Sequence, residues 1–203
     1  MGRDKAELVV AGERLADHAA RELTGVCEPV LEVGPGRSEL EAVDDDEPRA
    51  GPLVALVTGA RALRARQYEG AVLLLGVDLP FVDQRLLELL VRHPAAETVV
   101  PMAGGVRQSC CARYAPAALA TAAELVEQGE RAMHTLLSAV PVVEIADTEW
   151  RAVAPADALP DLDTPEDLAR HGIDPGSVRS CRPTIFSRCS TTPRWRRGMR
   201  SNR

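Results

Sequence analysis

The sequence predicts an α/β fold with a mostly parallel sheet, and two observations support this prediction. Apolar runs typical of strands alternate along the chain with segments whose apolar residues recur at helical spacing. One apolar run, residues 71–75, carries no charge and is followed by Gly76, Val77 and the lone carboxylate of Asp78. A short uncharged run bounded by turn residues is typical of a strand that is covered on both faces, as in a parallel sheet.

The individual elements follow from local patterns. The predicted helices share apolar residues at helical spacing, and they are 13–23, 53–66, 82–92, 116–127 and 131–137. The predicted strands share short apolar or alternating runs, and they are 26–33, 71–77, 98–102, 107–114 and 140–145. Thr24-Gly25 is a stop signal for the first helix, and a polar loop at 34–51 carries an acidic run at 44–47. Thr164 is expected to cap a last helix.

The length of 203 residues fits one domain, which we place at residues 1–173, with a tail at 174–203. The domain holds 16 basic and 29 acidic residues, whereas the tail holds eight arginines and one acid. Because the tail lacks apolar periodicity, we expect it to be disordered. The acidic domain lacks the basic footprint of a nucleic-acid-binding protein, and the tail has few aromatic side chains, such as Trp195, on which bases could stack. We therefore expect no nucleic-acid partner.

The apolar stretches and the cysteines of the sequence bear on where in the cell the protein is found. No stretch is long and apolar enough to span a membrane, and the first ten residues lack the apolar region of a signal peptide. The five cysteines are odd in number and include no CxxC pair, which favours reduced thiols. We expect a cytoplasmic protein without a membrane partner, and the oligomeric state stays open.

Asp78 is the first candidate for chemistry. Pro80 cannot continue a central strand, so the strand is expected to end near Asp78. Ligands of open α/β sheets bind outside the carboxyl ends of the strands, which places Asp78 at the mouth of a site. A lone carboxylate there suits Mg²⁺, which takes oxygen ligands and bridges to substrate phosphates. In the alternative interpretation, Asp78 caps the helix that begins near Val82 or Asp83.

Five segments, in order, resemble the molybdenum cofactor guanylyltransferases and their nucleotidyltransferase relatives. The family patterns are Met-Gly-x-Asp-Lys, Asp-x-x-Pro-x-x-Gly-Pro-Leu, a strand with a metal-binding Asp, Gln-Pro-Leu-x-Ala-x-Tyr and Asn-Thr-Pro-Glu-Asp-Leu. The matching segments are MGRDKAELVVAGERL (1–15), DDEPRAGPL (45–53), VLLLGVDLPF (72–81), RQSCCARY (107–114) and DLDTPEDLARH (161–171). The resemblance implies a three-layer Rossmann-like nucleotidyltransferase fold over residues 1–173.

One departure from the family concerns the N-terminus. In the family, Met-Gly-x-Asp-Lys follows a strand and a Gly-rich loop that wraps the nucleotide phosphates with backbone N–H groups. This sequence begins at the methionine of that motif. We therefore expect a sheet whose N-terminal strand is missing, with unpaired backbone groups on its neighbours. The two explanations are a start codon assigned too late and a true truncation; an in-frame strand and loop upstream would favour the first.

The resemblance implies roles for three residues on the phosphate side. Lys5 would be a point charge that binds the triphosphate. The alternative is a solvated surface lysine without a role in binding. Asp78 would hold Mg²⁺ between the enzyme and the triphosphate. Asp163 would be a second metal ligand, although the family more often has Asn there, and a turn residue before the Thr164 cap is the alternative.

The same resemblance assigns the guanosine end of the nucleotide to the acidic loop. Asp45 would bind the guanosine of GTP. Asp44 or Asp46 would take this role instead if the loop differs in length from that of the family. In the alternative interpretation, the acidic residues form a solvated loop and bind nothing.

The implied reaction transfers GMP from GTP to molybdopterin and releases pyrophosphate. The terminal phosphate of molybdopterin is already an anionic nucleophile, so catalysis would consist of positioning and charge neutralisation by Mg²⁺ and Lys5. The chain accordingly lacks a Ser/His/Asp or Cys/His arrangement, and adjacent Cys110 and Cys111 point to opposite faces of a strand. The alternatives are a related nucleotidyltransferase that uses CTP or another phosphorylated acceptor, and a non-catalytic remnant.

Overall fold

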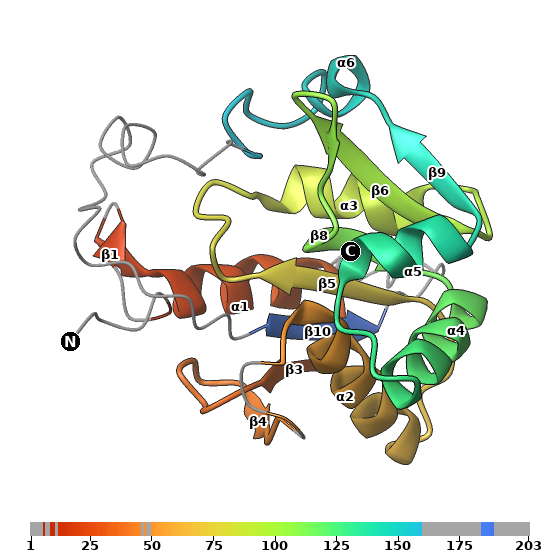
Figure 1. Ribbon diagram of the computed structural model, residues 1–203. Coiled ribbons are helices and arrows are strands. Elements are labelled where there is room, and N and C mark those ends of the chain that lie inside the picture. The colour runs from red at the N-terminus through yellow and green to blue at the C-terminus, as the bar shows by residue number, and fades with distance from the viewer. Residues whose placement is uncertain are drawn as a thin grey trace, which may run out of the picture.

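The computed structural model describes the side chains and backbone of residues 6, 9–10, 12–45, 47 and 50–159, and the backbone of residues 184–188. These residues form an α/β fold of three layers, with a mixed sheet between two groups of helices (Figure 1). The helices are α1 (Leu15–Val26), α2 (Pro52–Ala65), α3 (Gln84–Arg92), α4 (Pro116–Glu127), α5 (Met133–Ala139) and α6 (Asp147–Trp150). The predicted α/β class is confirmed.

Two sheets are present in this part of the chain. A small one pairs β1 with β2, and the large one contains eight strands in the order β4-β3-β10-β5-β8-β6-β7, with β9 beside β6. The strands are β1 (Val9–Val10), β2 (Glu13–Arg14), β3 (Val30–Val33), β4 (Glu41–Val43), β5 (Val72–Gly76), β6 (Thr98–Ala103), β7 (Val106–Arg107), β8 (Cys111–Tyr114), β9 (Val142–Ile145) and β10 (Thr184–Arg188). Strands β3, β4, β5, β6 and β9 run in one direction, whereas β7, β8 and β10 run against them. The sheet is therefore partly parallel.

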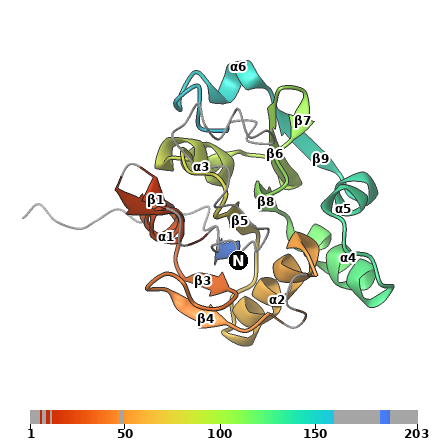
Figure 2. The same cartoon turned by 60° about the vertical axis from the view of Figure 1, so that its left-hand side comes forward.

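Strand β5 lies at the centre of the fold and is covered on both faces. Leu73 and Leu75 belong to the core cluster that includes α1 and α3. Val72 and Leu74 belong to the cluster that includes α2, α4 and α5. Figure 2 shows these two groups of helices on opposite sides of the sheet. The uncharged run 71–75 thus has the environment that its composition predicts, because alternate side chains point to opposite apolar layers.

The first helix differs from its prediction. Helix α1 continues through Thr24-Gly25 to Val26, where a stop signal was expected. Thr24 remains helical and its hydroxyl donates to the carbonyl of Ala20 at 2.6 Å. A Cβ on Gly25 would lie 2.2 Å from Nε2 of Gln84, so the glycine leaves space for the first residue of α3. Contact with α3 outweighs the weak helix propensity of glycine at this position.

The acidic loop is also more ordered than predicted. Residues 41–43 form β4, which pairs in parallel with β3. Glu32, a fully buried carboxylate on β3, accepts hydrogen bonds from the backbone N–H groups of Arg37 and Ser38, at 2.7 and 2.8 Å, and from the Ser38 hydroxyl at 2.7 Å. These bonds satisfy the buried charge and fix the turn that brings β4 back beside β3.

Strand β10 corrects two expectations. It lies between β3 and β5 and pairs antiparallel with both, so β3 and β5 do not carry the unpaired backbone groups that we expected beside a missing strand. The prediction of a disordered tail is wrong for Thr184–Arg188, because two buried neighbouring strands offer these residues a complete set of backbone partners. The boundary at residue 173, the helix expected from Thr164 and the other tail residues lie outside the described residues.

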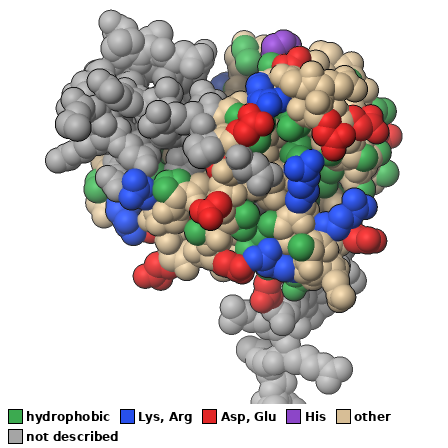
Figure 3. Space-filling view, turned by 60° about the horizontal axis from the view of Figure 1, so that its bottom comes forward, with side chains coloured by type: hydrophobic (Ala, Val, Ile, Leu, Met, Phe, Trp, Pro, Cys, Tyr) green, Lys and Arg blue, Asp and Glu red, His purple; other side chains and the backbone are tan. Residues whose placement is uncertain are grey.

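On the face shown in Figure 3, acidic and basic side chains of the described residues are interspersed and do not gather by sign. None of the helices in the described ranges is long and apolar enough to cross a membrane.

The central place of β10 predicts a strong effect of proline. Ser187 is paired with both Val30 and Leu73, so Ser187→Pro removes a backbone donor from the middle of the sheet. One buried backbone group without a hydrogen-bond partner costs about 1–3 kcal/mol. We therefore expect the melting temperature of Ser187→Pro to lie more than about 4 °C below that of Ser187→Ala. Equal melting curves for the two variants would show that β10 contributes nothing to the fold.

Candidate functional site

The carboxyl ends of three parallel strands meet at one edge of the sheet. Val43 of β4 pairs with Val33 of β3, and both Val33 and Gly76 of β5 pair with Thr184 of β10. The predicted site residues Asp45 and Asp78 each follow their strand by two positions, so both lie at this edge. Strands β4 and β5 are three positions apart, which corresponds to about 14 Å. A nucleotide laid along the edge would reach from one aspartate to the other.

The backbone at the end of β5 determines where the Asp78 carboxylate lies. The residue is half-buried, and its Oδ1 atom is buried. A Cβ added to Gly76 would lie 2.6 Å from this Oδ1 and 3.2 Å from the Cβ of Cys110. The carboxylate therefore packs over the bare Cα of Gly76, and a side chain at position 76 would displace it. The Gly76 N–H donates to the Cys110 carbonyl at 2.7 Å, which ties the end of β5 to the segment before β8.

The alternative role for Asp78 as a helix cap is wrong. Asp83 is the N-cap of α3, and its Oδ1 accepts a hydrogen bond from the Leu86 N–H at 3.2 Å. The segment between Asp78 and Asp83 is held separately, since Nε2 of the half-buried His18 on α1 lies 2.9 Å from the Val82 carbonyl oxygen. Asp78 therefore does not cap α3. It lies at the edge of the sheet where the parallel strands end.

The acidic loop contributes Asp45. Its carboxylate is half-buried, and Oδ1 accepts from the Glu47 N–H at 3.3 Å. Asp44 is exposed, and Asp46 lies outside the described residues. Of the two described candidates, Asp45 is therefore the one whose orientation is fixed by its own loop.

The other predicted site residues, Lys5 and Asp163, lie outside the described residues, so their roles stay predictions. Within the described part of the chain, no group of three or more His, Cys, Asp or Glu side chains could hold a metal ion. Asp78 is a single carboxylate at the end of β5. Such a residue fits Mg²⁺, which commonly uses one or two carboxylates together with substrate phosphates.

The Cys111 thiol and the Tyr114 hydroxyl, on the strand beside β5, are unsuited to nucleophilic chemistry. Cys111 is fully buried on β8, and this burial raises the pKa of its thiol. Burial likewise raises the pKa of Tyr114, whose hydroxyl donates to the Ser109 carbonyl at 2.7 Å. Both groups are neutral at physiological pH, as expected for structural side chains.

Residues 1–144 match the family of MobA-like NTP transferase domains. The chain belongs to this family. A probable molybdenum cofactor guanylyltransferase from Opitutus terrae is 34% identical over 150 residues, which cover 69% of this chain and 72% of that protein. A molybdenum cofactor guanylyltransferase from Ectopseudomonas mendocina is 33% identical over 128 residues, which cover 62% of this chain and 58% of that protein.

The fold comparison agrees with the family match. The solved structure of molybdopterin-guanine dinucleotide biosynthesis protein A from Archaeoglobus fulgidus superposes with a TM-score of 0.66. The match covers 82% of this chain and 88% of that one, at 20% sequence identity. This likeness shows the fold, and it confirms the nucleotidyltransferase architecture that the five sequence segments implied.

Sequence reasoning did not single out Gly76 or Arg131. The glycine was treated as a turn residue at the strand end, although its position two residues before Asp78 was visible. Arg131 contacts Glu47 across 84 positions of the chain, and nothing in the local pattern signals that pairing.

Gly76 supplies a test of how the carboxylate is held. Gly76→Ala forces Asp78 to move, so we expect affinity for a magnesium nucleoside triphosphate to fall at least about tenfold. Gly25→Ala is the matched control, because its new Cβ meets only the movable end of the Gln84 side chain. Affinity is measured by calorimetric titration, with melting curves to exclude unfolding. Equal affinities for both variants would contradict the proposed placement of Asp78.

Proposed function

We propose that this protein transfers GMP from GTP to the terminal phosphate of molybdopterin, releasing pyrophosphate and forming a guanine dinucleotide cofactor. Two curated relatives carry guanylyltransferase names, and the family match covers the first 144 residues. The observation that carries the proposal is the Asp78 carboxylate, held over Gly76 at the carboxyl end of the central strand. A carboxylate at the carboxyl end of a central strand can hold the Mg²⁺ that bridges to the phosphates of a triphosphate.

The proposed reaction needs no nucleophile from the protein. An oxygen of the molybdopterin phosphate attacks the α-phosphorus of GTP, and a new P–O–P bridge forms. The bond from the α-phosphorus to the bridging oxygen of the β-phosphate breaks, and pyrophosphate leaves with that electron pair. The attacking phosphate is ionised before the reaction, so positioning and charge neutralisation account for catalysis. This agrees with the neutral, buried state of Cys111 and Tyr114.

The proposed roles are divided between the two ends of the nucleotide. Lys5 places a positive charge on the triphosphate, and Asp45 accepts hydrogen bonds from guanine. Asp78, with Asp163 as the second proposed ligand, would hold Mg²⁺. When bound, Mg²⁺ neutralises the charge that develops on the phosphates. The bare Cα of Gly76 leaves space for the Asp78 carboxylate, which therefore lies against the end of β5 before substrate arrives.

The test compares two aspartates that lie five residues apart. We expect Asp78→Asn to abolish magnesium-dependent formation of the guanine dinucleotide from GTP and molybdopterin, because the amide lowers the charge that holds the metal. Asp83→Asn is the control, since asparagine caps a helix as well as aspartate. Product is measured by chromatography, with CTP run in parallel.

The outcomes separate the alternatives. Retained activity in Asp78→Asn, within about threefold of the parent, would contradict its role. Turnover of CTP in preference to GTP would assign a related cytidylyltransferase. Binding of a nucleotide without turnover would favour another phosphorylated acceptor, and absence of both binding and turnover would favour a non-catalytic remnant.

A further inference from the structure

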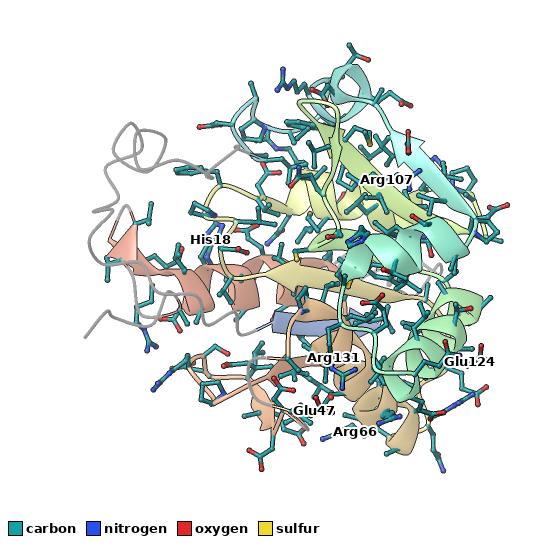
Figure 4. All side chains as sticks on the ribbon, in the orientation of Figure 1. His18, Glu47, Arg66, Arg107, Glu124 and Arg131 are labelled. Atoms are coloured by element: carbon teal, nitrogen blue, oxygen red, sulfur yellow. The ribbon has the colours of Figure 1, made fainter. Side chains whose placement is uncertain are left out.

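Arg131, in the turn between α4 and α5, joins two parts of the chain that are 84 residues apart (Figure 4). Its Nη2 atom donates to both carboxylate oxygens of Glu47, at 3.0 and 2.9 Å, and Nε lies 3.3 Å from Oε2. Its Nη1 atom donates to the carbonyl oxygens of Val126 and Glu130, at 3.1 and 2.8 Å. The five N–H groups of the guanidinium thus have five contacts within the protein.

This arrangement excludes two simple roles for Arg131. With its N–H groups directed at protein acceptors, the guanidinium is not arranged to bind substrate itself. The ion pair is also partly exposed, with 34% of the Arg131 side chain and 54% of the Glu47 side chain accessible. Exposed pairs contribute about 0–1 kcal/mol to global stability. The contact therefore acts on the local conformation of the acidic loop.

The turn that carries Arg131 is itself fixed. The Glu130 carboxylate accepts hydrogen bonds from the N–H groups of Ala132 and Arg131, at 2.9 and 2.7 Å, and from the Thr135 hydroxyl at 2.9 Å. The two backbone donors, of which Ala132 has the larger effect, lower the pKa of this carboxyl group. Glu130 thus stays ionised at physiological pH and holds the Arg131 backbone in place.

Arg131 touches the acidic loop at a second place. A Cβ on Gly51, the residue before α2, would lie 3.4 Å from the Arg131 carbonyl oxygen. Glu47 and Gly51 bracket the end of the loop that follows Asp45. The Glu47 N–H in turn donates to Asp45 Oδ1 at 3.3 Å. A chain of contacts therefore runs from Arg131 through Glu47 to the carboxylate at the edge of the sheet.

We propose that Arg131 is a positioning residue for nucleobase selection, which it exerts by fixing Glu47 and thereby the Asp45 carboxylate. The inference rests on the proposed function, in which Asp45 meets the base. A carboxylate accepts hydrogen bonds only, and the edge of guanine presents two donors, N1–H and the N2 amino group. Cytosine presents one donor at the corresponding edge, its N4 amino group, beside the N3 acceptor, which a fixed carboxylate repels. Selection for guanine requires that Asp45 cannot rotate away, and Arg131 supplies that constraint.

The test measures dissociation constants of GTP and CTP with Mg²⁺ for the full chain and three variants. We expect Arg131→Gln to lower the preference for GTP over CTP by about tenfold, mainly through weaker GTP binding, with a melting temperature near that of the parent. Arg131→Lys should behave similarly, because an ammonium cannot reproduce the two-pronged contact with Glu47. Arg92→Gln is the control, since it removes an exposed ion pair with Glu88 within α3, on the opposite side of the sheet from α2, α4 and α5.

A double variant distinguishes positioning from a separate contribution. The double variant carries both Asp45→Asn and Arg131→Gln. If Arg131 acts through Asp45, the double variant should bind GTP as tightly as the Asp45→Asn single variant does. Additive losses would overturn the inference. An unchanged GTP preference in Arg131→Gln would overturn it too, while leaving the proposed function intact. A parent protein that does not prefer GTP would overturn both.

Discussion

Burial of β5 on both faces is the constraint on which the rest of the structure depends. Its side chains alternate between two apolar layers, with Leu73 and Leu75 against α1 and α3 and Leu74 against the helices of the other side. A fully buried leucine contributes about 1.5–3 kcal/mol, and an unpartnered polar group there would cost a similar amount. The strand therefore carries no polar side chain inside the sheet. The first carboxylate after it, Asp78, lies at the edge where the parallel strands end.

The two candidate ends of the site are held by different means. The Asp78 carboxylate packs over Gly76, whose missing side chain leaves space for it. Asp45 lies on a loop with little apolar packing, so its orientation depends on polar contacts that reach from the turn between α4 and α5. The proposed phosphate end of the site thus lies beside the buried core, and the proposed base end lies on a loop whose conformation the Arg131–Glu47 ion pair helps to hold.

Local patterns predicted those elements in which local and tertiary preferences agree. The uncharged run 71–75 predicted β5, and Pro116 at a first-turn position predicted the start of α4. The patterns failed where a distant partner decides the conformation. Helix α1 passes Gly25 because Gln84 packs there, and β10 forms because β3 and β5 offer it backbone partners. The place of Asp78 could be predicted from its strand, whereas its orientation over Gly76 and the contact of Arg131 with Glu47 depend on tertiary structure.

The most direct test of this account is a crystal structure of the protein with Mg²⁺ and GTP bound. The account predicts a carboxylate oxygen of Asp78 at about 2.1 Å from Mg²⁺, with the triphosphate at the end of β5 and the guanine edge against the Asp45 carboxylate. A triphosphate bound at another edge of the sheet, with Asp78 outside the coordination sphere of the metal, would contradict it.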